Sequence, residues 1–254
     1  MKVLGIDIGG SALKGAPVDI ATGTLVAERY KVETPTVRTP AGMAAGVKEI
    51  VDHFKWKGRV GIGFPGVVQG PVTLTSANLH KKFIGLDTEK IFADACGCPV
   101  SLVNDADAAG IAEMTFGAGR GFQGSVLLLT LGTGVGSALF YRGVLFPNSE
   151  LGHLQIRGRS AERYISSAAR KRRGLDWKQW GTELGAYLRS LEVLVSPELI
   201  IIGGGVSAKS EKFFKYAKCR APKVTAAAYN AAGIVGAALW AVDQKKYLAA
   251  HPAK

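Results

Sequence analysis

Residues 3–15 read VLGIDIGGSALKG, an apolar run that ends in two glycines and continues directly into a second apolar run. Residues 126–141 read VLLLTLGTGVGSALFY and follow the same plan. Each stretch predicts a strand, a tight glycine turn and a second strand. A Rossmann unit would instead pass from its first glycine turn into a helix. The recurrence therefore predicts an α/β protein made by structural duplication, with two α/β domains around a central cleft.

Hydrophobic spacing and turn residues predict the remaining elements. Helices are expected over residues 41–54, 88–96, 106–116, 160–171, 176–195 and 230–242, and further strands over 24–32, 59–64, 99–103 and 198–202. We divide the chain into a small N-terminal domain, 1–103, and a larger domain, 104–229. A C-terminal helix over about 230–254 is expected to pack back onto the first domain.

The composition is that of a globular protein, since 47% of the 254 residues are hydrophobic and 20% are charged. This balance allows a sizeable core. The apolar runs fall short of the ~20 residues that a membrane span needs. Asp7 comes too early in the chain for the apolar core of a signal peptide. We therefore expect a cytoplasmic protein without a membrane partner.

The formal net charge of +12 is high for such a protein. It indicates either a polyanionic partner, such as nucleic acid, an anionic membrane or a phosphate polymer, or merely a basic surface. The three cysteines show no CxxC spacing. They predict small buried side chains rather than a metal site or a disulfide framework.

The two glycine turns are candidate phosphate sites. Glycines let backbone N–H groups approach phosphate oxygens, because no Cβ stands in the way. In the first turn Asp7 is suited to hold Mg²⁺ through water, and Lys14 offers a compact positive charge. The second turn, Gly132-Thr133-Gly134, adds a hydroxyl. The alternative for each turn is an ordinary tight hairpin.

Asn104-Asp105 follows the apolar run 100–103 and precedes a helical stretch. Residues that work in the sites of α/β sheets commonly stand at such a strand-to-helix junction. Asp105 is a candidate general base for removing a proton from a hydroxyl group. It is also a candidate N-cap of the following helix, since Asp often has that duty.

Glu150 and His153 lie three residues apart, close enough to converge on one ligand from a short turn. Their acceptor and donor atoms suit the vicinal hydroxyls of a sugar. Glu162 either completes this sugar site or is a solvated residue on a helix face. Between His153 and Gly174 there is no cysteine and no other histidine, so zinc is not expected.

Gly66 and Asn78 are further candidates for lining a sugar pocket. Gly66 ends the loop entry Phe64-Pro65-Gly66, and Asn78 lies in the following segment. Turn chemistry alone explains Pro65-Gly66 equally well.

Several basic residues form a candidate track for a polyphosphate chain, which positive charge along a groove would hold in a salt-sensitive way. The alternative is a set of solvated cations, some of which stabilise a helix C-terminus. The candidate track consists of Lys81, Lys82, Arg170, Lys171, Arg172, Arg173, Lys209 and Lys212.

The order of these motifs resembles the ROK family of sugar kinases and repressors, within the actin-like, hexokinase-type ATPase superfamily. The likeness extends from Asp7 to about Trp240 and includes a late Gly-Gly-Gly segment at 203–205. Within the family, residues 130–140 and 150–156 look most like the polyphosphate glucokinases. Many ROK members carry a cysteine-rich zinc motif after the Gly-His pair. Residues 157–174 contain no cysteine, so no structural zinc is expected.

The resemblance implies a role for each matching position. Asp105 would remove the proton from the sugar 6-hydroxyl. The other hydroxyls would be held by Asn104, Glu150, His153 and Glu162. The transferred phosphoryl group would be surrounded by Asp7, Gly9, Gly10, Ser11, Lys14, Gly132, Thr133 and Gly134. Gly203, Gly204 and Gly205 correspond to a turn that lies near the nucleotide in ATP-using relatives.

These roles predict Mg²⁺-dependent phosphoryl transfer from inorganic polyphosphate to glucose. One alternative is an ATP-dependent glucokinase, or a kinase for mannose or an N-acyl amino sugar. A hypothesis from another class is a basic nucleic-acid-binding regulator that has lost catalysis. It is disfavoured because a pure binder has no use for the intact Asn104-Asp105 and Glu150/His153 sets. A transcription factor is not expected either, since ROK repressors carry an N-terminal winged-helix domain and this chain begins with its first catalytic strand. Relatives often dimerise, so a homodimer is expected.

Overall fold

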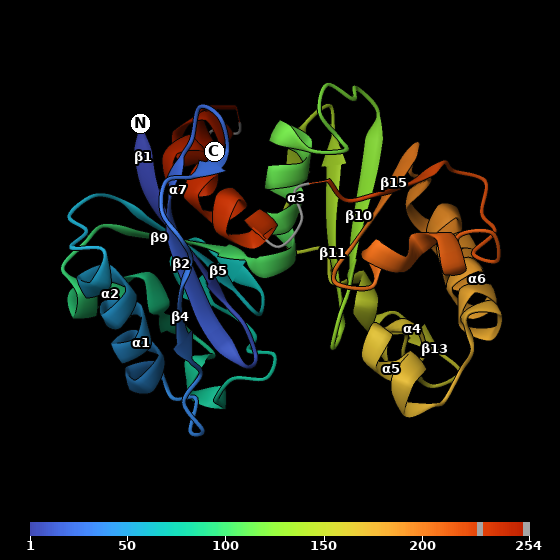
Figure 1. Cartoon of the computed structure of the whole chain (residues 1–254), viewed down its shortest axis with the longest axis horizontal. Helices are drawn as coiled ribbons and strands as arrows, with labels where there is room; N and C mark the ends of the chain where they lie inside the picture. Colours follow the sequence, from blue (N-terminus) through green and yellow to red (C-terminus); the bar gives the residue numbers. More distant parts are fainter. Residues whose placement is uncertain (228–230, 251–254) are drawn as a thin grey trace. The chain divides into compact units, whose positions relative to one another are not determined.

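The computed structural model of the protein describes residues 1–227 and 231–250. The chain divides into two compact units, of which the first contains Met1–Ala112 with the C-terminal helix and the second begins at Glu113. Each unit is an α/β structure built on one mixed sheet (Figure 1). Among the described residues no helix is both long and apolar enough to cross a membrane.

The first unit is built around a sheet of order β3-β2-β1-β5-β9, in which β4 also pairs with β2. Its strands are β1 (Lys2–Ile8), β2 (Ala12–Asp19), β3 (Thr24–Leu25), β4 (Tyr30–Glu33), β5 (Val60–Phe64) and β9 (Val100–Asn104). A small separate sheet consists of β6 (Val68–Gln69), β7 (Val72–Thr73) and β8 (Leu86–Asp87). The helices are α1 (Pro40–His53), η1 (Lys81–Phe83), α2 (Thr88–Cys96), the start of α3 (Asp105–Phe116) and α7 (Ala232–Ala250).

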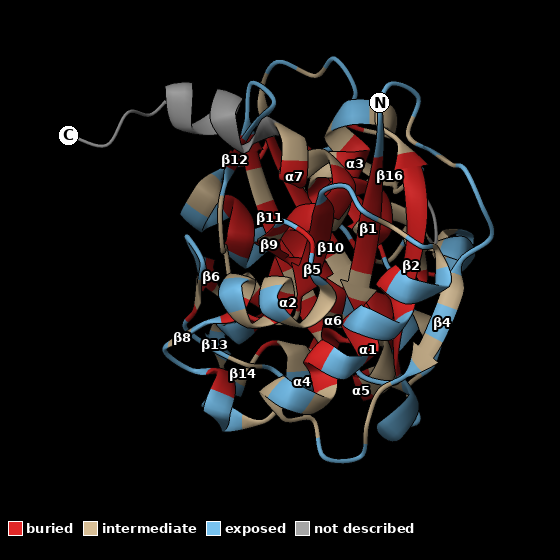
Figure 2. Cartoon of the chain, turned by 90° about the vertical axis from the view of Figure 1, so that its left-hand side faces the viewer, coloured by how far each residue is buried: buried red, intermediate tan, exposed pale blue. Residues whose placement is uncertain are grey.

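Side-chain alternation along the strands decides which helices cover which face of this sheet. Leu4 and Ile6 of β1 lie in the hydrophobic core with residues of α1 and α2. On the opposite face the backbone of α7 approaches so closely that only glycine fits beneath it. A Cβ at Gly5 would lie 2.0 Å from the carbonyl oxygen of Ile234, and one at Gly61 would lie 1.8 Å from that of Ala237. The central strands are consequently buried along most of their length (Figure 2).

The second unit is built around a sheet of order β12-β11-β10-β15-β16. Its strands are β10 (Ser125–Leu131), β11 (Val135–Tyr141), β12 (Val144–Phe146), β15 (Leu199–Gly203) and β16 (Lys223–Thr225), with a separate pair β13 (Gln155–Ile156) and β14 (Arg159–Ser160). The helices are η2 (Leu151–His153), α4 (Glu162–Ile165), α5 (Ser167–Arg172), α6 (Trp177–Val195) and η3 (Ser207–Lys212). Leu127 and Leu129 of β10 share a core with Trp180, Leu184 and Leu188 of α6.

The predicted duplication is confirmed. β1 and β2 are an antiparallel pair in which Asp7 stands opposite Lys14, and β10 and β11 are an antiparallel pair in which Thr130 stands opposite Gly136. In each unit the first strand of the pair also has a parallel neighbour, β5 for β1 and β15 for β10.

Two predicted elements are wrong in detail. The single strand expected over 24–32 is two short strands, because β3 and β4 pair with β2 in different registers on either side of Pro17, which has no N–H for a ladder. The single helix expected over 160–171 is split into α4 and α5 at Ser166. Ser166 is extended, with φ −63° and ψ 155°, and its hydroxyl accepts the N–H of Ala169 as the N-cap of α5.

The first turns of α3 belong to the first unit, whereas the sequence-based division placed the whole helix in the second domain. The reason is close packing on α7. Val103 and Ala108 form a small core with Ala237, and a Cβ at Gly236 would lie 1.6 Å from the carbonyl oxygen of Ala108. α7 also packs on β1 and β5. Residues 230 and 251–254 of the expected C-terminal helix lie outside the described residues.

Candidate functional site

The first unit gathers several candidate residues at the carboxyl ends of its parallel strands. β1, β5 and β9 run parallel, and Asp7, Gly63 and Val103 are neighbours across them. A Cβ at Gly63 would lie 3.7 Å from the Cα of Asp105 and 3.8 Å from Oδ1 of Asp7. Asp7 and Asp105 therefore flank the same glycine at the edge of the sheet where sites of open α/β sheets form.

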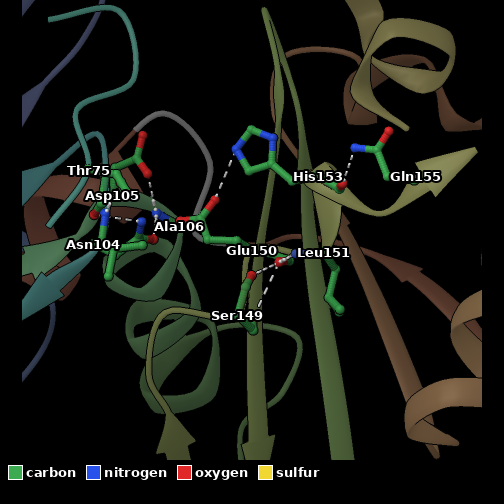
Figure 3. Close-up of polar contacts among 12 residues, drawn as sticks. Thr75, Asn104, Asp105, Ala106, Ser149, Glu150, Leu151, His153 and Gln155 are labelled. Carbon is green, nitrogen blue, oxygen red and sulfur yellow. Dashed lines mark hydrogen bonds and ion pairs between the residues drawn. The ribbon is translucent and has the colours of Figure 1, made fainter. Parts of the chain in front are cut away.

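Asn104, rather than Asp105, is the N-cap of α3. Its Oδ1 accepts the N–H of Ala106, the second residue of the helix, at 2.9 Å (Figure 3). It also accepts the N–H of Asp107, the third residue, at 3.1 Å. Its Nδ2 donates to the carbonyl oxygen of Gly66 at 3.1 Å. Asn104 therefore has the capping role that the sequence analysis left open for Asp105. Asp105 is the first residue of the helix, and its Oδ1 accepts the N–H of Ala106 at 2.8 Å.

Asp7 is a partly buried carboxyl group beside one lysine. Burial raises the pKa of Asp7, and the positive charge of Lys14 partly offsets that rise. Gly233 of α7 permits this placement, since a Cβ there would lie 3.1 Å from Cγ of Asp7. A carboxylate in this position fits Mg²⁺, which is commonly held by one or two carboxylates, waters and substrate phosphates. Within the described residues no group of three or more His, Cys, Asp or Glu is arranged to hold a metal.

The first glycine turn is held by a threonine that the sequence analysis missed. The N–H of Gly9 donates to the carbonyl oxygen of Ala12 at 3.0 Å, and Thr34 Oγ1 donates to the carbonyl oxygen of Gly9 at 2.9 Å. Gly10 and Ser11 are exposed at the tip of the turn. The only sequence signal for Thr34 is that it directly follows β4, which pairs with β2 beside the turn.

The second unit brings its two glycine segments together. The N–H of Gly132 donates to the carbonyl oxygen of Gly134 at 3.1 Å, so residues 132–134 form a closed turn with Thr133 exposed at its tip. Gly204 has a φ of +81°, and a Cβ there would lie 2.7 Å from the carbonyl oxygen of Leu131. The segment Gly203–Gly205 therefore lies against the start of the turn 132–134.

Glu150, His153 and Glu162 lie together in this unit. Nε2 of His153 is 3.5 Å from Oε2 of Glu150 (Figure 3). A Cβ at Gly134 would lie 2.6 Å from Oε2 of Glu162, which puts this carboxylate beside the glycine turn. Burial raises the pKa of Glu150, while His153 lowers it and the charge of Glu162 raises it further. The arrangement offers acceptors and donors for hydroxyl groups directly beside a turn suited to phosphate.

The segment that carries Glu150 and His153 is fixed to β11 and α6 by residues that the sequence analysis missed. Ser137 Oγ accepts the N–H of Leu151 at 3.0 Å and donates to the carbonyl oxygen of Ser149. Tyr187 Oη donates to the carbonyl oxygen of Leu151 at 3.0 Å. A Cβ at Gly152 would lie 2.1 Å from the carbonyl oxygen of Val135. The serine on a strand facing the core was a usable signal, whereas nothing in the sequence marked Tyr187.

Gly66 and Asn78 belong to one loop of the first unit. A Cβ at Gly66 would lie 2.5 Å from the carbonyl oxygen of Thr75, and the N–H of Ala77 donates to the carbonyl oxygen of Pro65 at 2.9 Å. Asn78 is exposed with a φ of +60°, and its carbonyl oxygen accepts from Nη1 of Arg38 at 2.6 Å. Backbone packing thus accounts for Gly66, and turn geometry accounts for Asn78. Their sugar-binding roles stay predictions.

The basic residues of the predicted track differ in what they contact. Arg173 forms a two-pronged ion pair with Glu183 at 2.5 and 2.8 Å, and Arg170 lies over the ring of Trp177 at 3.9 Å. Arg172 donates to the carbonyl oxygen of Arg163 at 3.1 Å. The lysines of the track are exposed: Lys81, Lys82, Lys171, Lys209 and Lys212.

Comparisons with known proteins point in one direction. The sequence profile of the ROK family matches residues 3–166. A polyphosphate glucokinase of Mycobacterium tuberculosis (strain CDC 1551 / Oshkosh) is 43% identical over 239 residues, which cover 94% of this chain and 90% of the relative. The polyphosphate glucokinase of Mycobacterium leprae (strain TN) is 41% identical over 92% of this chain and 73% of the relative.

Solved structures agree with these sequence relatives. The inorganic polyphosphate/ATP-glucomannokinase of Arthrobacter sp. strain KM has a TM-score of 0.91 and 42% identity, covering 96% of this chain and 99% of the other. A ROK family glucokinase of Streptomyces griseus, solved with glucose and AMPPNP, has a TM-score of 0.78 at 24% identity, covering 94% and 98%. The second likeness concerns the fold alone, which is the actin-like, hexokinase-type fold expected from the motifs.

Proposed function

The chain belongs to the ROK family, and on that premise we propose that it transfers a phosphoryl group from inorganic polyphosphate to the 6-hydroxyl of glucose. The observation that carries the proposal is the grouping of Glu150, His153 and Glu162 beside the glycine turn 132–134. Groups that bind hydroxyls and a turn that accepts phosphate are the two requirements of a sugar kinase. Similarity to polyphosphate glucokinases over nearly the whole chain supports the choice of donor and acceptor.

In the proposed reaction the oxygen of the sugar 6-hydroxyl attacks the terminal phosphorus of the donor, and Asp105 takes the proton of that hydroxyl. Phosphoryl transfer needs mainly positioning and charge neutralisation, because the bond to the leaving phosphate breaks as the new bond forms. Asn104 fixes the start of α3 and so orients Asp105. Asn104, Glu150, His153 and Glu162 hold the other hydroxyls, with Gly66 and Asn78 in the neighbouring loop.

The transferred group is held by the backbone of both glycine turns and by charge. Lys14 stands opposite Asp7 on β2 and neutralises phosphate oxygens. Asp7 would hold Mg²⁺ through water, and the ion would neutralise phosphate charge. The residues that contact phosphate are Gly9, Gly10, Ser11, Gly132, Thr133, Gly134, Gly203, Gly204 and Gly205.

ATP is a second candidate donor, favoured by the dual donor named for the Arthrobacter kinase, and mannose is a second acceptor on the same ground. A nucleic-acid-binding regulator without activity is disfavoured, since the relatives cited above are kinases. A homodimer and a cytoplasmic location remain predictions.

The proposed donor is tested by a coupled assay for glucose 6-phosphate with long-chain polyphosphate or ATP, each with and without Mg²⁺. We expect turnover with polyphosphate that disappears when the metal is chelated. Turnover with ATP at low concentration and none with polyphosphate would reject polyphosphate as the donor, and the assignment as a sugar kinase would stand. No product with either donor, across glucose and mannose, would reject the function.

The proposed base is tested by Asp105→Asn, and Asn104→Ala is the comparison that removes the helix cap. Asp105→Asn should lower kcat by about 10²–10⁴-fold and leave the unfolding temperature unchanged, because the cap of α3 is kept. Asn104→Ala should lower the stability by about 1 kcal/mol through loss of the cap. Near wild-type turnover by Asp105→Asn would show that another group removes the proton.

A further inference from the structure

One segment of the second unit, residues 209–223, is rich in basic side chains. Between positions 209 and 223 basic side chains recur every two or three residues, and Glu211 is the single acidic residue. We call these side chains the basic strip, which consists of Lys209, Lys212, Lys215, Lys218, Arg220 and Lys223. Only its first two members belong to the track predicted from the sequence.

Local folding turns the strip toward solvent. η3 and the turns after it bury Phe213, Ala217 and Ala221 in the core of the unit. The lysines at 209, 212, 215 and 218 and the arginine at 220 are exposed, and Lys223 is half-buried on β16. β16 is the edge strand of the sheet, so the strip follows the border of the unit.

The strip begins at the glycine segment of the candidate site. The N–H of Ser207, the first residue of η3, donates to the carbonyl oxygen of Gly204 at 3.0 Å. At the other end, Lys223 is paired with Ile200, near the start of β15, whereas Gly203 ends that strand. The basic residues therefore lead away from the glycine segment along the edge of the sheet.

The strip differs from the basic run at 170–173 in what its side chains already contact. Within the described residues no member of the strip forms an ion pair with a carboxylate. Lys215 and Lys223 lie over the rings of Tyr216 and Phe214 at 5.1 and 5.8 Å, contacts that leave an ammonium group able to bind an anion. In the run, by contrast, Arg173 is already paired with Glu183.

We propose that the basic strip binds the distal phosphates of a polyphosphate chain, those beyond the phosphate that is transferred. The proposal rests on polyphosphate being the donor. A row of positive side chains suits a flexible linear polyanion, since lysine ammonium groups attract phosphate oxygens without demanding one geometry. ATP and tripolyphosphate have only two phosphates beyond the one that is transferred, so they are expected to contact fewer residues of the strip than a long chain does. The strip therefore determines the preference for long chains and leaves chemistry at the transferred phosphate unaffected.

The test compares a triple substitution in the strip with equal charge loss elsewhere on the same unit. The strip variant is Lys209→Gln/Lys212→Gln/Lys215→Gln. The control is Arg120→Gln/Arg142→Gln/Lys178→Gln, whose residues are exposed and outside the site. A third variant, Lys171→Gln/Arg172→Gln, examines the run on α5. KM and kcat are measured with long-chain polyphosphate, tripolyphosphate and ATP, and binding of fluorescent long-chain polyphosphate is measured without glucose.

The strip variant should raise KM and Kd for the long chain by about tenfold, as expected for the loss of three exposed charge contacts, with kcat unchanged. Its KM for tripolyphosphate and ATP, and all constants of the control, should stay within about twofold. Equal effects of the strip and control variants would mean that the net charge of the protein, and not the strip, attracts the chain. A larger effect of the α5 variant would mean that the run on α5 binds the chain. Both results overturn the proposal, as does stronger binding of RNA than of polyphosphate by the strip.

Failure of the donor assignment is distinguishable from failure of the strip. If wild-type protein makes no glucose 6-phosphate from polyphosphate, the donor fails and the strip proposal falls with it. If wild-type protein uses polyphosphate and the strip variant keeps its KM and Kd, only the strip proposal is rejected. Thermal unfolding of each variant shows that it is folded, which solvent-facing substitutions are expected to preserve.

Discussion

Ser137 fixes the backbone on both sides of Glu150, since its hydroxyl bonds to Ser149 and Leu151. Ser137→Ala leaves a partly buried N–H and a partly buried carbonyl oxygen without this partner, which lowers the stability by about 1 kcal/mol. Because the segment carries Glu150 and His153, KM for glucose should rise several-fold while KM for the phosphoryl donor is unchanged. Steady-state kinetics and urea unfolding check both effects. A change confined to the donor KM would contradict this role.

The control for Ser137 is Ser190→Ala on α6. Ser190 is exposed, and its hydroxyl donates to the carbonyl oxygen of Ala186 in its own helix at 3.2 Å. This substitution removes a hydroxyl of the same kind whose hydrogen bond stays within its own helix. KM for glucose should stay at the wild-type value, and the free energy of unfolding should change by no more than about 0.5 kcal/mol.

Glu150 links function to stability through its raised pKa. The pKa lies above the ordinary 4.5 chiefly because burial disfavours the carboxylate. The carboxyl group of Glu150 therefore binds its proton more tightly in the folded chain than in the unfolded chain. Stability is consequently lost as the pH rises through the folded-state pKa. Glu150→Gln should melt at a higher temperature than wild type at pH 7, and this advantage should shrink as the pH falls to 4.5. Thermal unfolding from pH 4 to 8 measures it.

Glu183 provides a comparison of opposite sign. The hydrogen-bonded ion pair with Arg173 lowers the pKa of Glu183. Stability from this pair is present above the ordinary pKa of 4.5 and is lost as the pH falls through the lower, folded-state value. Glu183→Gln should therefore melt below wild type at pH 7, with the gap closing in acid. The same direction of change in both variants would refute the assignment of causes to either carboxylate.

Close packing of α7 on the first sheet depends on glycines in β1 and β5. Gly61→Ala would place its Cβ 1.8 Å from the carbonyl oxygen of Ala237, so the helix must shift. Overpacking of this kind should lower the free energy of unfolding by about 1–3 kcal/mol or more. The control is Gly42→Ala in α1, where the nearest atoms are 3.4 Å from the Cβ and a helical alanine is favoured over glycine. Urea unfolding that showed equal losses would contradict the packing argument.

Elements with a clear hydrophobic period could be predicted from the sequence, and elements decided by single backbone groups could not. The spacing of Met43, Val47 and Ile50 predicted α1, which begins after the Thr39 N-cap. The break of the helix at Ser166 depends on one hydroxyl capping α5, and a polar residue of that kind is also tolerated within a helix. The two-residue strands β6, β7 and β8 were missed because such short segments carry no period.

The candidate site shows the same division at the level of the molecule. Motifs on one strand end or one turn could be predicted, so Glu150 with His153 and Asn104 with Asp105 were identified together. Their supports could not be predicted, because Tyr187 is 36 residues from Leu151 and Thr34 is 25 residues from Gly9. Contacts between such distant positions depend on the packing of elements, for which one sequence carries no local signal.

The net charge of +12 predicts how the whole protein responds to salt. Each phosphate that the protein neutralises releases counterions, so log KM for polyphosphate should rise with log salt by about 0.7 per contacted phosphate, the value for single-stranded nucleic acids. KM for glucose should be flat over the same range, since the sugar is neutral, and KM for ATP should rise with an intermediate slope. Initial rates from 50 to 300 mM KCl at fixed Mg²⁺ measure all three. Parallel slopes for polyphosphate and glucose would mean that salt acts on the fold or on catalysis, and the excess charge would then have no part in binding the donor.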